Sequence, residues 1–339
     1  MEAAGKRARK TRSMPVRSSR CLNRVFTTLL GSLAPGIVAA AGPAFTVMSF
    51  NTWHDLSQVK NGFEKGREAI RRSGADIVCL QESTPQTSTR LAEELGWHRA
   101  ENGTGSVEIL SRFPVVETYA GKEPTPDRFI GARFLLGDEP RREVIVFNTH
   151  LDYVHYGPYA AARPQATPAS TLAENRRSER VPQITAVLNA MKPYLTAADS
   201  LPVILTGDFN GPSHLDWTQA AAANHHGIGP VAWPESRLVI DRGMVDSFRH
   251  RHPDPVAMPG TTWSAIHKDS EPQDRIDFIY HKGTALRLVD SRVFTTEVET
   301  TIGAWGSDKT PVETNTWPSD HAAVVSSYCF DAASSTPGE

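Results

Sequence analysis

The sequence predicts a mixed α/β fold in which two mainly antiparallel β-sheets pack together and are flanked by helices. One observation is that short β-branched and aromatic runs alternate with helix-type patterns between residues 45 and 330. The other is that several neighbouring strand-like runs are joined by connections too short to hold a helix, which favours antiparallel pairing. With 39% hydrophobic and 22% charged residues, the 339-residue chain can bury a large core.

The first predicted elements are two strands and two helices in alternation. The apolar runs FTVMSF (residues 45–50) and ADIVCLQE (residues 75–82) predict strands. Residues 63–74 and 88–96 have helix-type patterns, and each of these segments ends in a glycine. Glycine is the residue that most often terminates a helix, so the helix ends are well marked.

The middle of the chain is rich in strands and contains one long loop. Residues 153–170 combine Pro, Ala and Tyr without an apolar period, so we expect a loop there. A loop of this length in a compact domain is often functional. The four strands predicted before it cover residues 107–113, 115–120, 128–136 and 142–152.

The last third of the predicted domain begins with a helix. Pro182 lies either in its first turn or at a break from an earlier helix. The apolar residues that predict this helix, by their spacing, are Ile184, Val187, Leu188 and Met191. The elements predicted after it are a strand over residues 201–210, the start of a helix within 214–222, and strands over 273–281, 285–294 and 319–330.

The first 41 residues differ from the rest of the chain. A basic segment is followed by the mostly apolar VFTTLLGSLAPGIVAAAG, which contains the small residues Ala39, Ala40 and Ala41. This order predicts a secretory signal peptide, residues 1–41, because the apolar part is too short and too interrupted to span a bilayer. A disordered basic tail and an uncleaved anchor are the alternatives. We therefore expect a secreted or extracytoplasmic protein without a stable membrane anchor, and a disordered tail at residues 331–339.

Cleavage after residue 41 would leave 28 basic and 37 acidic residues, so the remaining chain is acidic. Such a chain has no general attraction for phosphate backbones, although a local basic patch would serve. Cys79 and Cys329 lie in apolar strand-like runs. We expect them to be buried free thiols rather than a disulfide, a metal site or a nucleophile.

Polar residues capable of metal binding or acid–base chemistry stand at the ends of the predicted strands. If the strands bring them to one rim, their negative charge requires a divalent cation. Oxygen ligands favour Mg²⁺, with Mn²⁺ or Ca²⁺ as alternatives, and no zinc-type pattern is present. Carboxylates and imidazoles around such a cation suit the attack of water on a phosphate ester. These residues are Asn51, Glu82, His150, Asp208, Asn210, Asp277, Asp320 and His321.

Six short motifs carry a resemblance to a known family. MSFNTW, DIVCLQES, NTHLD, TGDFN, DRIDFIYH and SDHAAV occur in this order between about residues 45 and 330. In order and approximate spacing they resemble those of the endonuclease/exonuclease/phosphatase superfamily, which includes deoxyribonuclease I-like nucleases, sphingomyelinases and inositol polyphosphate phosphatases. The resemblance implies one domain over residues 45–330, folded as a four-layered α/β sandwich with metal-dependent phosphoesterase activity.

The resemblance also implies which residues hold the metal. Glu82 matches the family's metal-ligand glutamate, and Asp320 matches a second acidic group at the metal. Asn51 matches a metal ligand or a phosphate contact, although a strand-end asparagine often only caps a turn.

Further matches concern the reacting groups. Asp208 matches the aspartate that orients or deprotonates the attacking water, and Asn210 matches the amide that contacts the phosphate. His321 matches the catalytic histidine, with Asp277 holding its tautomer. His150 matches a histidine near the leaving or nonbridging oxygen, so the identity of the proton donor stays open.

Loops around this rim are expected to select the substrate. Tyr153 and Tyr156 in the long loop would stack on a base, a sugar or an inositol ring, or would only pack the loop. His214 would face the pocket, unless residues 213–216 merely initiate a helix. Trp263, shortly before the DRIDFIYH motif, is expected to form a wall of the site.

Other charged groups have simpler interpretations. Arg176, Arg177 and Arg180 are expected on a solvated helix face, with contact to a second phosphate as the alternative. The histidines expected at the surface are His225, His226, His250, His252, His267 and His281.

The leading interpretation is a secreted phosphoesterase that hydrolyses a mono- or diester of a small organophosphate, by in-line attack of a water activated by the metal and Asp208. An extracellular endonuclease is the alternative, disfavoured by the acidic composition and by the lack of a basic stripe with interleaved aromatic residues. A sphingomyelinase-like enzyme would need a membrane-entering segment, which we do not recognise. A catalytically decayed binding protein is disfavoured because every expected catalytic position carries a competent side chain. We therefore expect a small phosphoester as the substrate, with nucleic acid as the alternative. The sequence implies no protein partner.

Overall fold

The computed structural model describes residues 44–101, 105–120, 128–138, 141–268, 270–298 and 315–331. The predicted signal peptide, residues 1–41, lies outside the described residues, as do residues 332–339 of the predicted tail. A search of the described residues found no helix with the length and apolar character needed to cross a membrane.

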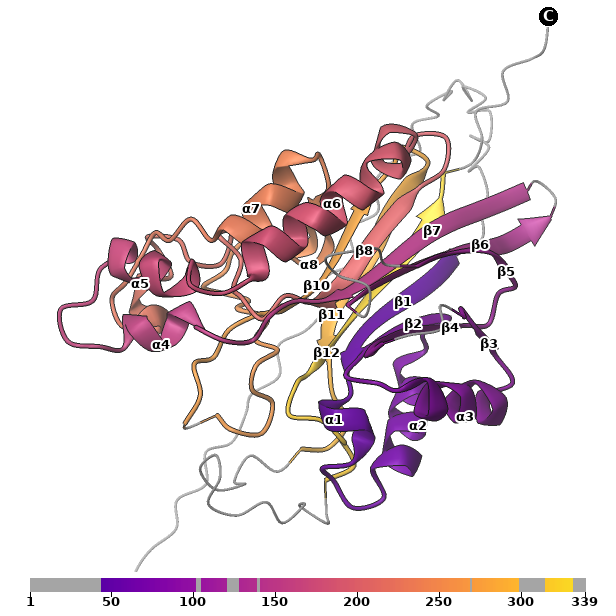
Figure 1. The fold of residues 1–339 in the computed structure, drawn as a ribbon, viewed down its shortest axis with the longest axis horizontal. Helices are drawn as coiled ribbons and strands as arrows, with labels where there is room; N and C mark the ends of the chain where they lie inside the picture. The colour runs from indigo at the N-terminus through magenta and orange to yellow at the C-terminus, as the bar shows by residue number, and fades with distance from the viewer. Residues whose placement is uncertain are drawn as a thin grey trace, which may run out of the picture. The chain divides into compact units, whose positions relative to one another are not determined.

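Two six-stranded sheets form the centre of the fold (Figure 1). Neighbouring strands are antiparallel except in the β1–β2 and β7–β8 pairs, which are parallel. The first sheet has the order β11 (Leu286–Phe294), β12 (Ala323–Phe330), β1 (Ala44–Asn51), β2 (Ile77–Gln81), β4 (Val107–Ser111) and β3 (His98–Arg99). The second has the order β5 (Val115–Ala120), β6 (Phe129–Asp138), β7 (Arg141–His150), β8 (Val203–Asp208), β10 (Asp277–Lys282) and β9 (Val245–Asp246).

Helices cover the outer face of each sheet (Figure 1). α2 (Gly62–Ser73) and α3 (Pro85–Leu95) pack on the first sheet, whereas α6 (Arg180–Thr196) and α7 (Pro234–Asp241) pack on the second. The order helix, sheet, sheet, helix confirms the predicted four-layered α/β sandwich. The shorter helices are α1 (Trp53–Leu56), α4 (Gly157–Ala161), α5 (Pro168–Asn175), the 3₁₀-helix η1 (Ala222–His225) and α8 (Ser247–Arg251).

The predicted ends of α2 and α3 are confirmed. Gly74 and Gly96 terminate these helices with φ angles of 73° and 70°, in the left-handed region that glycine adopts without strain. α3 starts at Pro85, where the side chain of Thr84 accepts a hydrogen bond from the backbone N–H of Thr87.

The expectation of an unbroken loop over residues 153–170 is wrong. α4 lies inside this segment, and α5 begins at its end. Both helices carry a proline in the first turn, and Thr167 and Ser170 form a reciprocal capping box that starts α5. These are local signals, so the sequence contained the information for both helices.

The prediction of a helix that begins within residues 214–222 is also wrong, because this segment forms turns that lead into η1. Asp216 was the residue with capping-type spacing from Ser213. Its carboxylate instead binds Arg249 and Arg275, which come from distant parts of the chain.

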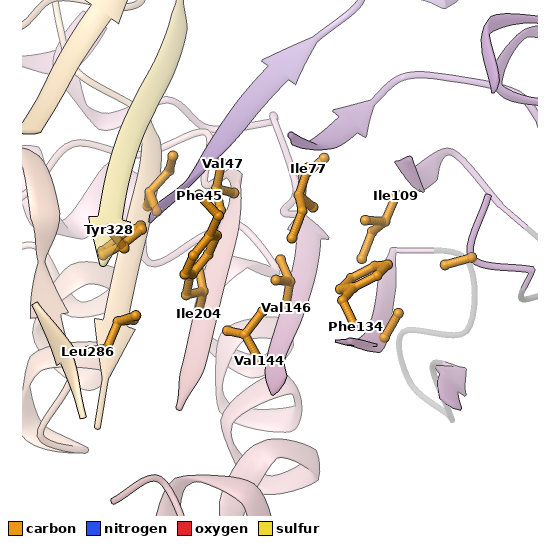
Figure 2. Packing of buried hydrophobic residues seen from close by; sticks show 14 of the residues in the cluster. Phe45, Val47, Ile77, Ile109, Phe134, Val144, Val146, Ile204, Leu286 and Tyr328 are labelled. Atoms are coloured by element: carbon orange, nitrogen blue, oxygen red, sulfur yellow. The ribbon is translucent and has the colours of Figure 1, made fainter. Parts of the chain in front are cut away.

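The layer between the two sheets is apolar over most of its extent (Figure 2). Alternate residues of each strand face it, since side chains of a strand point to opposite faces in turn. Phe45 and Val47 enter it from β1, and Val144 and Val146 enter it from β7. Cys79 of β2 is buried there; it and Cys329 are free thiols, as predicted.

Towards the end of β1 and β7, the same face becomes polar. Gln81 donates hydrogen bonds to Asn148 Oδ1 (2.7 Å) and Ser49 Oγ (3.2 Å), and Thr206 Oγ1 lies 3.3 Å from the same Asn148 oxygen. All four side chains are fully buried. We call these four residues the polar layer; it links β1 and β2 of one sheet to β7 and β8 of the other.

Candidate active site

The next residues on the inter-sheet face, beyond the polar layer, form the candidate site. β1 ends at Asn51, β7 at His150 and β8 at Asp208, while β10 starts at Asp277. Asp208 pairs in register with His150 on one side and with Asp277 on the other. The two-residue period of strands therefore places these side chains on one face.

Gly207 allows β7 and β8 to approach closely at this point. Its φ angle is 156°, and a Cβ atom built on it would lie 2.2 Å from the carbonyl oxygen of Thr149. No larger residue fits between the two strands without displacing β7. The glycine before Asp208 is thus explained by strand packing.

His321 lies between two aspartates. Its Nδ1 is 3.0 Å from Asp277 Oδ2, and its Nε2 is 3.8 Å from Asp208 Oδ2. Burial acts to lower the pKa of His321, but the charges of Asp277 and Asp208 outweigh it and hold this pKa well above the ordinary value. The ring is therefore an imidazolium at neutral pH, oriented by Asp277.

The surroundings of Asp208 favour its neutral form, whereas those of His321 favour the charged form. Burial, followed by the neighbouring charge of Asp277, raises the pKa of Asp208 to about 7. Its Oδ1 accepts the backbone N–H of Asn210 at 2.8 Å, and its Oδ2 accepts the side-chain N–H of Asn51 at 2.9 Å. This carboxylate is held in place from two sides.

His150 is an uncharged imidazole. Burial lowers the pKa of His150 to about 4. The side-chain amide of Asn210 lies 3.0 Å from His150 Nε2 and also donates to the carbonyl oxygen of Leu151. Asn210 adopts a left-handed φ of 48°, which turns its side chain back towards β7.

Asn51 and Glu82 bring the first sheet to the site. The amide nitrogen of Asn51 bridges Glu82 Oε1 (3.1 Å) and Asp208 Oδ2 (2.9 Å). The amide oxygen of Asn51 accepts the backbone N–H of Trp53. In this arrangement the amide nitrogen of Asn51 orients two carboxylates, and its amide oxygen keeps one lone pair beyond the bond to Trp53.

The turn after Asn51 was not expected from the sequence. Four successive non-glycine residues, Trp53 to Leu56, have φ angles between 47° and 64°, a conformation that costs roughly 1 to 2 kcal/mol per residue. Asp55 holds the turn by accepting hydrogen bonds from Thr84 and Thr87. The turn directs the backbone N–H of His54 onto Glu82 Oε2 at 2.7 Å. Strain of this kind is a common feature of functional sites.

Asp320 completes a set of four carboxylates, which we call the site carboxylates: Glu82, Asp208, Asp277 and Asp320. Burial raises the pKa of Asp320 to about 7, and the charge of Glu82 acts in the same direction. One oxygen each of Asp277 and Asp320 is buried without a hydrogen-bond partner. Across the described ranges, the site carboxylates form ion pairs with histidines alone.

These side chains fit a hard divalent cation, since buried carboxylate oxygens without partners require a positive charge. The ligand atoms of Asp208, Asp277 and His321 lie within 4.8 Å of one another, close enough for a shared metal ion. Glu82 and Asp320, the predicted metal ligands, are subject to the charge of His321 as well, which acts to lower the pKa of each.

Of the four predicted substrate-binding side chains, Trp263 is the one that the structure describes in contact with a catalytic residue. The ring of Trp263 packs 4.7 Å from that of His321, as expected of a wall. Tyr153 is 70% exposed. Tyr156 is buried and donates to Asp274 Oδ2 at 2.9 Å, so it packs the loop, and His214 is held by Ser236.

The expectation for Arg180 is wrong, whereas Arg176 and Arg177 are exposed as expected. Arg180 is fully buried and donates to the carbonyl oxygens of Asp152, Val154 and His155. Its guanidinium is used by the backbone, which local sequence cannot reveal. The surface assignment of histidines is also partly wrong: His226 and His250 are exposed, His225 and His252 are half-buried, and His267 and His281 are buried.

Comparisons with known proteins by sequence identify a family and a relative. The model of the Endonuclease/Exonuclease/phosphatase family matches residues 48–321. An uncharacterized protein of Caenorhabditis elegans is 31% identical over 299 residues, which cover 84% of this chain and 91% of that protein.

Two solved structures share the fold at low identity. An AP endonuclease from Archaeoglobus fulgidus superposes with a TM-score of 0.53 at 18% identity, over 83% of this chain and 98% of that one. A mannosyl-6-phosphatase from Bacteroides thetaiotaomicron gives 0.51 at 18% identity, over 84% and 99%.

Proposed function

The chain belongs to the endonuclease/exonuclease/phosphatase family and is a hydrolase of phosphoric ester bonds, and we propose that its substrate is a small organophosphate. The charge of the site carries this proposal. Three buried carboxylates and the partly exposed Glu82 meet there, and their ion pairs in the described ranges involve no Lys or Arg. Such a centre offers no row of basic groups for the successive phosphates of a polynucleotide.

In the proposed reaction, Asp208 takes the proton of the attacking water. The pKa of about 7 that burial gives Asp208 suits a general base near neutral pH. His321 donates from Nε2 to the reacting phosphate, because Asp277 holds its Nδ1.

Uncharged groups complete the site. Asn210 and His150 lie beside Asp208 and suit contacts to nonbridging oxygens. Glu82 and Asp320 would hold Mg²⁺, or Mn²⁺ or Ca²⁺, which would neutralise phosphate charge and polarise the phosphorus atom.

An endonuclease is the second candidate, favoured by the likeness to an AP endonuclease. Ionic strength separates the two candidates. Cleavage of a polyanion through several phosphate contacts falls steeply with salt, whereas hydrolysis of a small ester responds weakly.

The test is an assay of the purified protein with Mg²⁺, Mn²⁺ or Ca²⁺ against nitrophenyl mono- and diesters, sugar and inositol phosphates, sphingomyelin and plasmid DNA. We expect hydrolysis of small esters that chelation abolishes and that Glu82→Ala removes. Cleavage of plasmid DNA alone, with steep salt dependence, would favour the endonuclease. No hydrolysis of any substrate would favour a binding protein.

We also propose that the protein acts outside the cytoplasm, because the order of basic, apolar and small residues in the first 41 positions is that of an export signal. Amino-terminal sequencing of protein from a secreting host tests this. A mature start near residue 42 is expected, and an intact amino terminus in the cell fraction would contradict it.

A further inference from the structure

A cavity of about 190 Å³ lies beside the candidate site, and none of the catalytic groups lines it. Three segments form its walls: Pro158 of α4, residues of η1 and its surroundings, and residues 271–274 before β10. Its polar lining residues are Asn224, His225, His226, Glu271, Gln273 and Asp274. We call it the Asp274 pocket.

The Asp274 pocket is connected to the catalytic centre through the backbone. Asp274 exchanges two backbone hydrogen bonds with Trp263, of 2.9 and 3.0 Å, and the Trp263 ring packs on His321. Asp274 also precedes Asp277 by three residues, so their Cα atoms are at most about 11 Å apart. The pocket and the catalytic centre are therefore neighbours in the fold.

The walls of the pocket disfavour a second anion. No Lys or Arg lines it, and Asp274 and Glu271 contribute two carboxylates. Burial lowers the pKa of His225 to about 4, so this imidazole is neutral. A second phosphate would meet two carboxylates and, among the described lining residues, no Lys or Arg.

The same walls favour hydroxyl groups. Asp274 is held rigidly by Tyr156 Oη (2.9 Å) and Trp217 Nε1 (2.8 Å). Tyr159 donates to Glu271, which fixes α4 against residues 271–274. The amides of Asn224 and Gln273 belong to exposed residues and present both donors and acceptors.

The pocket offers an aromatic ligand little surface for stacking. The Trp217 ring, at 1% exposure, is stacked on His225 at 4.0 Å and meets the edge of Trp233 at 4.9 Å, so neither face is open for stacking. The volume corresponds to about six water molecules, which is enough for one small ring.

We propose that the Asp274 pocket binds the alcohol part of the phosphoester, and that this part is an uncharged ring bearing several hydroxyl groups. The inference rests on the proposed function, because it assumes that a small phosphoester occupies the catalytic centre. It goes further by naming the chemistry of the leaving group.

The test compares two substrates in the metal-loaded protein, a hexose 6-phosphate and 4-nitrophenyl phosphate. Asn224→Leu and Gln273→Leu remove pocket hydrogen bonds and leave the site carboxylates in place. We expect each variant to lower the ratio of kcat/KM for the sugar ester to that for the aryl ester about tenfold, mainly through KM. Gln219→Leu, at an exposed glutamine outside the pocket, is the matched control and should leave both values unchanged.

A charge variant sharpens the test. Gln273→Lys is expected to improve hydrolysis of a hexose bisphosphate relative to the monophosphate. The proposal is overturned if the pocket variants change both esters equally, or if the wild-type protein already prefers the bisphosphate.

Direct binding separates this inference from the proposed function. Titration with an unphosphorylated methyl hexoside, followed by NMR, should show weak binding that Gln273→Leu abolishes. This readout needs no catalysis, so it stands even if no ester is hydrolysed. Absence of binding at high millimolar sugar, together with unchanged substrate ratios, would refute the proposed role of the pocket. It would not affect the proposal that the protein is a phosphoesterase.

Discussion

In the part of the chain that the structure describes, two groups of largely buried carboxylates are balanced in opposite ways. In the first, which we call the ion cluster, Asp216 and Asp246 are bound by Arg249 and Arg275. Arg275 lies 2.8 Å from Asp246 Oδ2, and Arg249 Nε lies 2.8 Å from Asp216 Oδ1. The site carboxylates have no such arginines, and two of their oxygens are left without a partner.

The difference separates structure from chemistry. In the ion cluster the chain supplies its own positive charge, which compensates for the cost of burying the acids. At the active site the chain supplies acids in excess, which leaves a place for a cation and a phosphate. A cluster of acids without Lys or Arg partners from the described chain is therefore the better sign of function in this fold.

The first way to break this comparison is Asp208→Asn. Loss of the general base should lower kcat about 10³-fold. The asparagine oxygen still accepts the hydrogen bond of Asn210, but its NH2 group cannot accept that of Asn51, so the free energy of unfolding should fall by about 1 to 3 kcal/mol. Steady-state kinetics and denaturant unfolding measure the two effects. Asp241→Asn, at an exposed position, serves as the control. A loss below tenfold would remove Asp208 from the reaction.

The ion cluster should show the reverse. Arg275→Met leaves two buried aspartates without their shared partner, so we expect a loss of about 3 to 5 kcal/mol in the free energy of unfolding. Urea unfolding measures it. Arg251→Met, which breaks an exposed pair with Asp290, should cost at most about 1 kcal/mol.

If Arg275→Met fails to fold, the double variant with Asp246→Asn decides the matter, because Asp216 keeps Arg249 as its partner. Removal of the unpaired negative charge should restore folding. An unfolded double variant would mean that packing, rather than charge, determines the effect.

The pH dependence of stability separates two kinds of buried histidine. Neighbouring aspartates raise the pKa of His321, whereas burial lowers the pKa of His281 to about 4. A pKa below the ordinary value of 6.5 means that His281 contributes stability above pH 6.5, which is lost as the pH falls towards 4. Between these values, wild type should lose about 2 kcal/mol more stability than His281→Gln.

Chemical denaturation at several pH values tests this. His98→Gln removes an exposed imidazole and should follow the wild-type curve. Parallel curves for wild type and His281→Gln would show that this histidine is not buried in its neutral form.

The smallest expected effect concerns the cation. Asp320→Asn removes the negative charge of a buried carboxylate that has an oxygen without a partner, so the metal-free protein should become more stable by about 1 kcal/mol. The same variant should lose the rise in Tm that Mg²⁺ gives to wild type. A variant that still responds fully to Mg²⁺ would place the cation elsewhere.

Much of the fold could be predicted because strands carry their signal locally. The apolar runs that end in Asn51, Asp208 and Asp277 gave both the strands and the polar rim, since period and strand end are read from neighbouring residues. The same residues carried the family resemblance.

The remainder depends on partners far along the chain. Residues 213–216 have the spacing of a helix start, but the arginines that bind Asp216 are more than 30 residues away. Arg180 was interpreted as solvated, but it binds the backbone of the loop after β7. The left-handed turn at Trp53–Leu56 contains no glycine to announce it, and Asp55 stabilises it through Thr84.

The polar layer has a consequence for how activity is acquired. Hydrogen bonds between its side-chain amides join the two sheets next to the reacting groups. Each sheet carries only part of the reacting groups. A fragment, or an intermediate with one half formed, thus holds an incomplete set. Turnover should accordingly be all-or-none with respect to the native state, and recovery of catalysis during refolding would report the final docking of the halves.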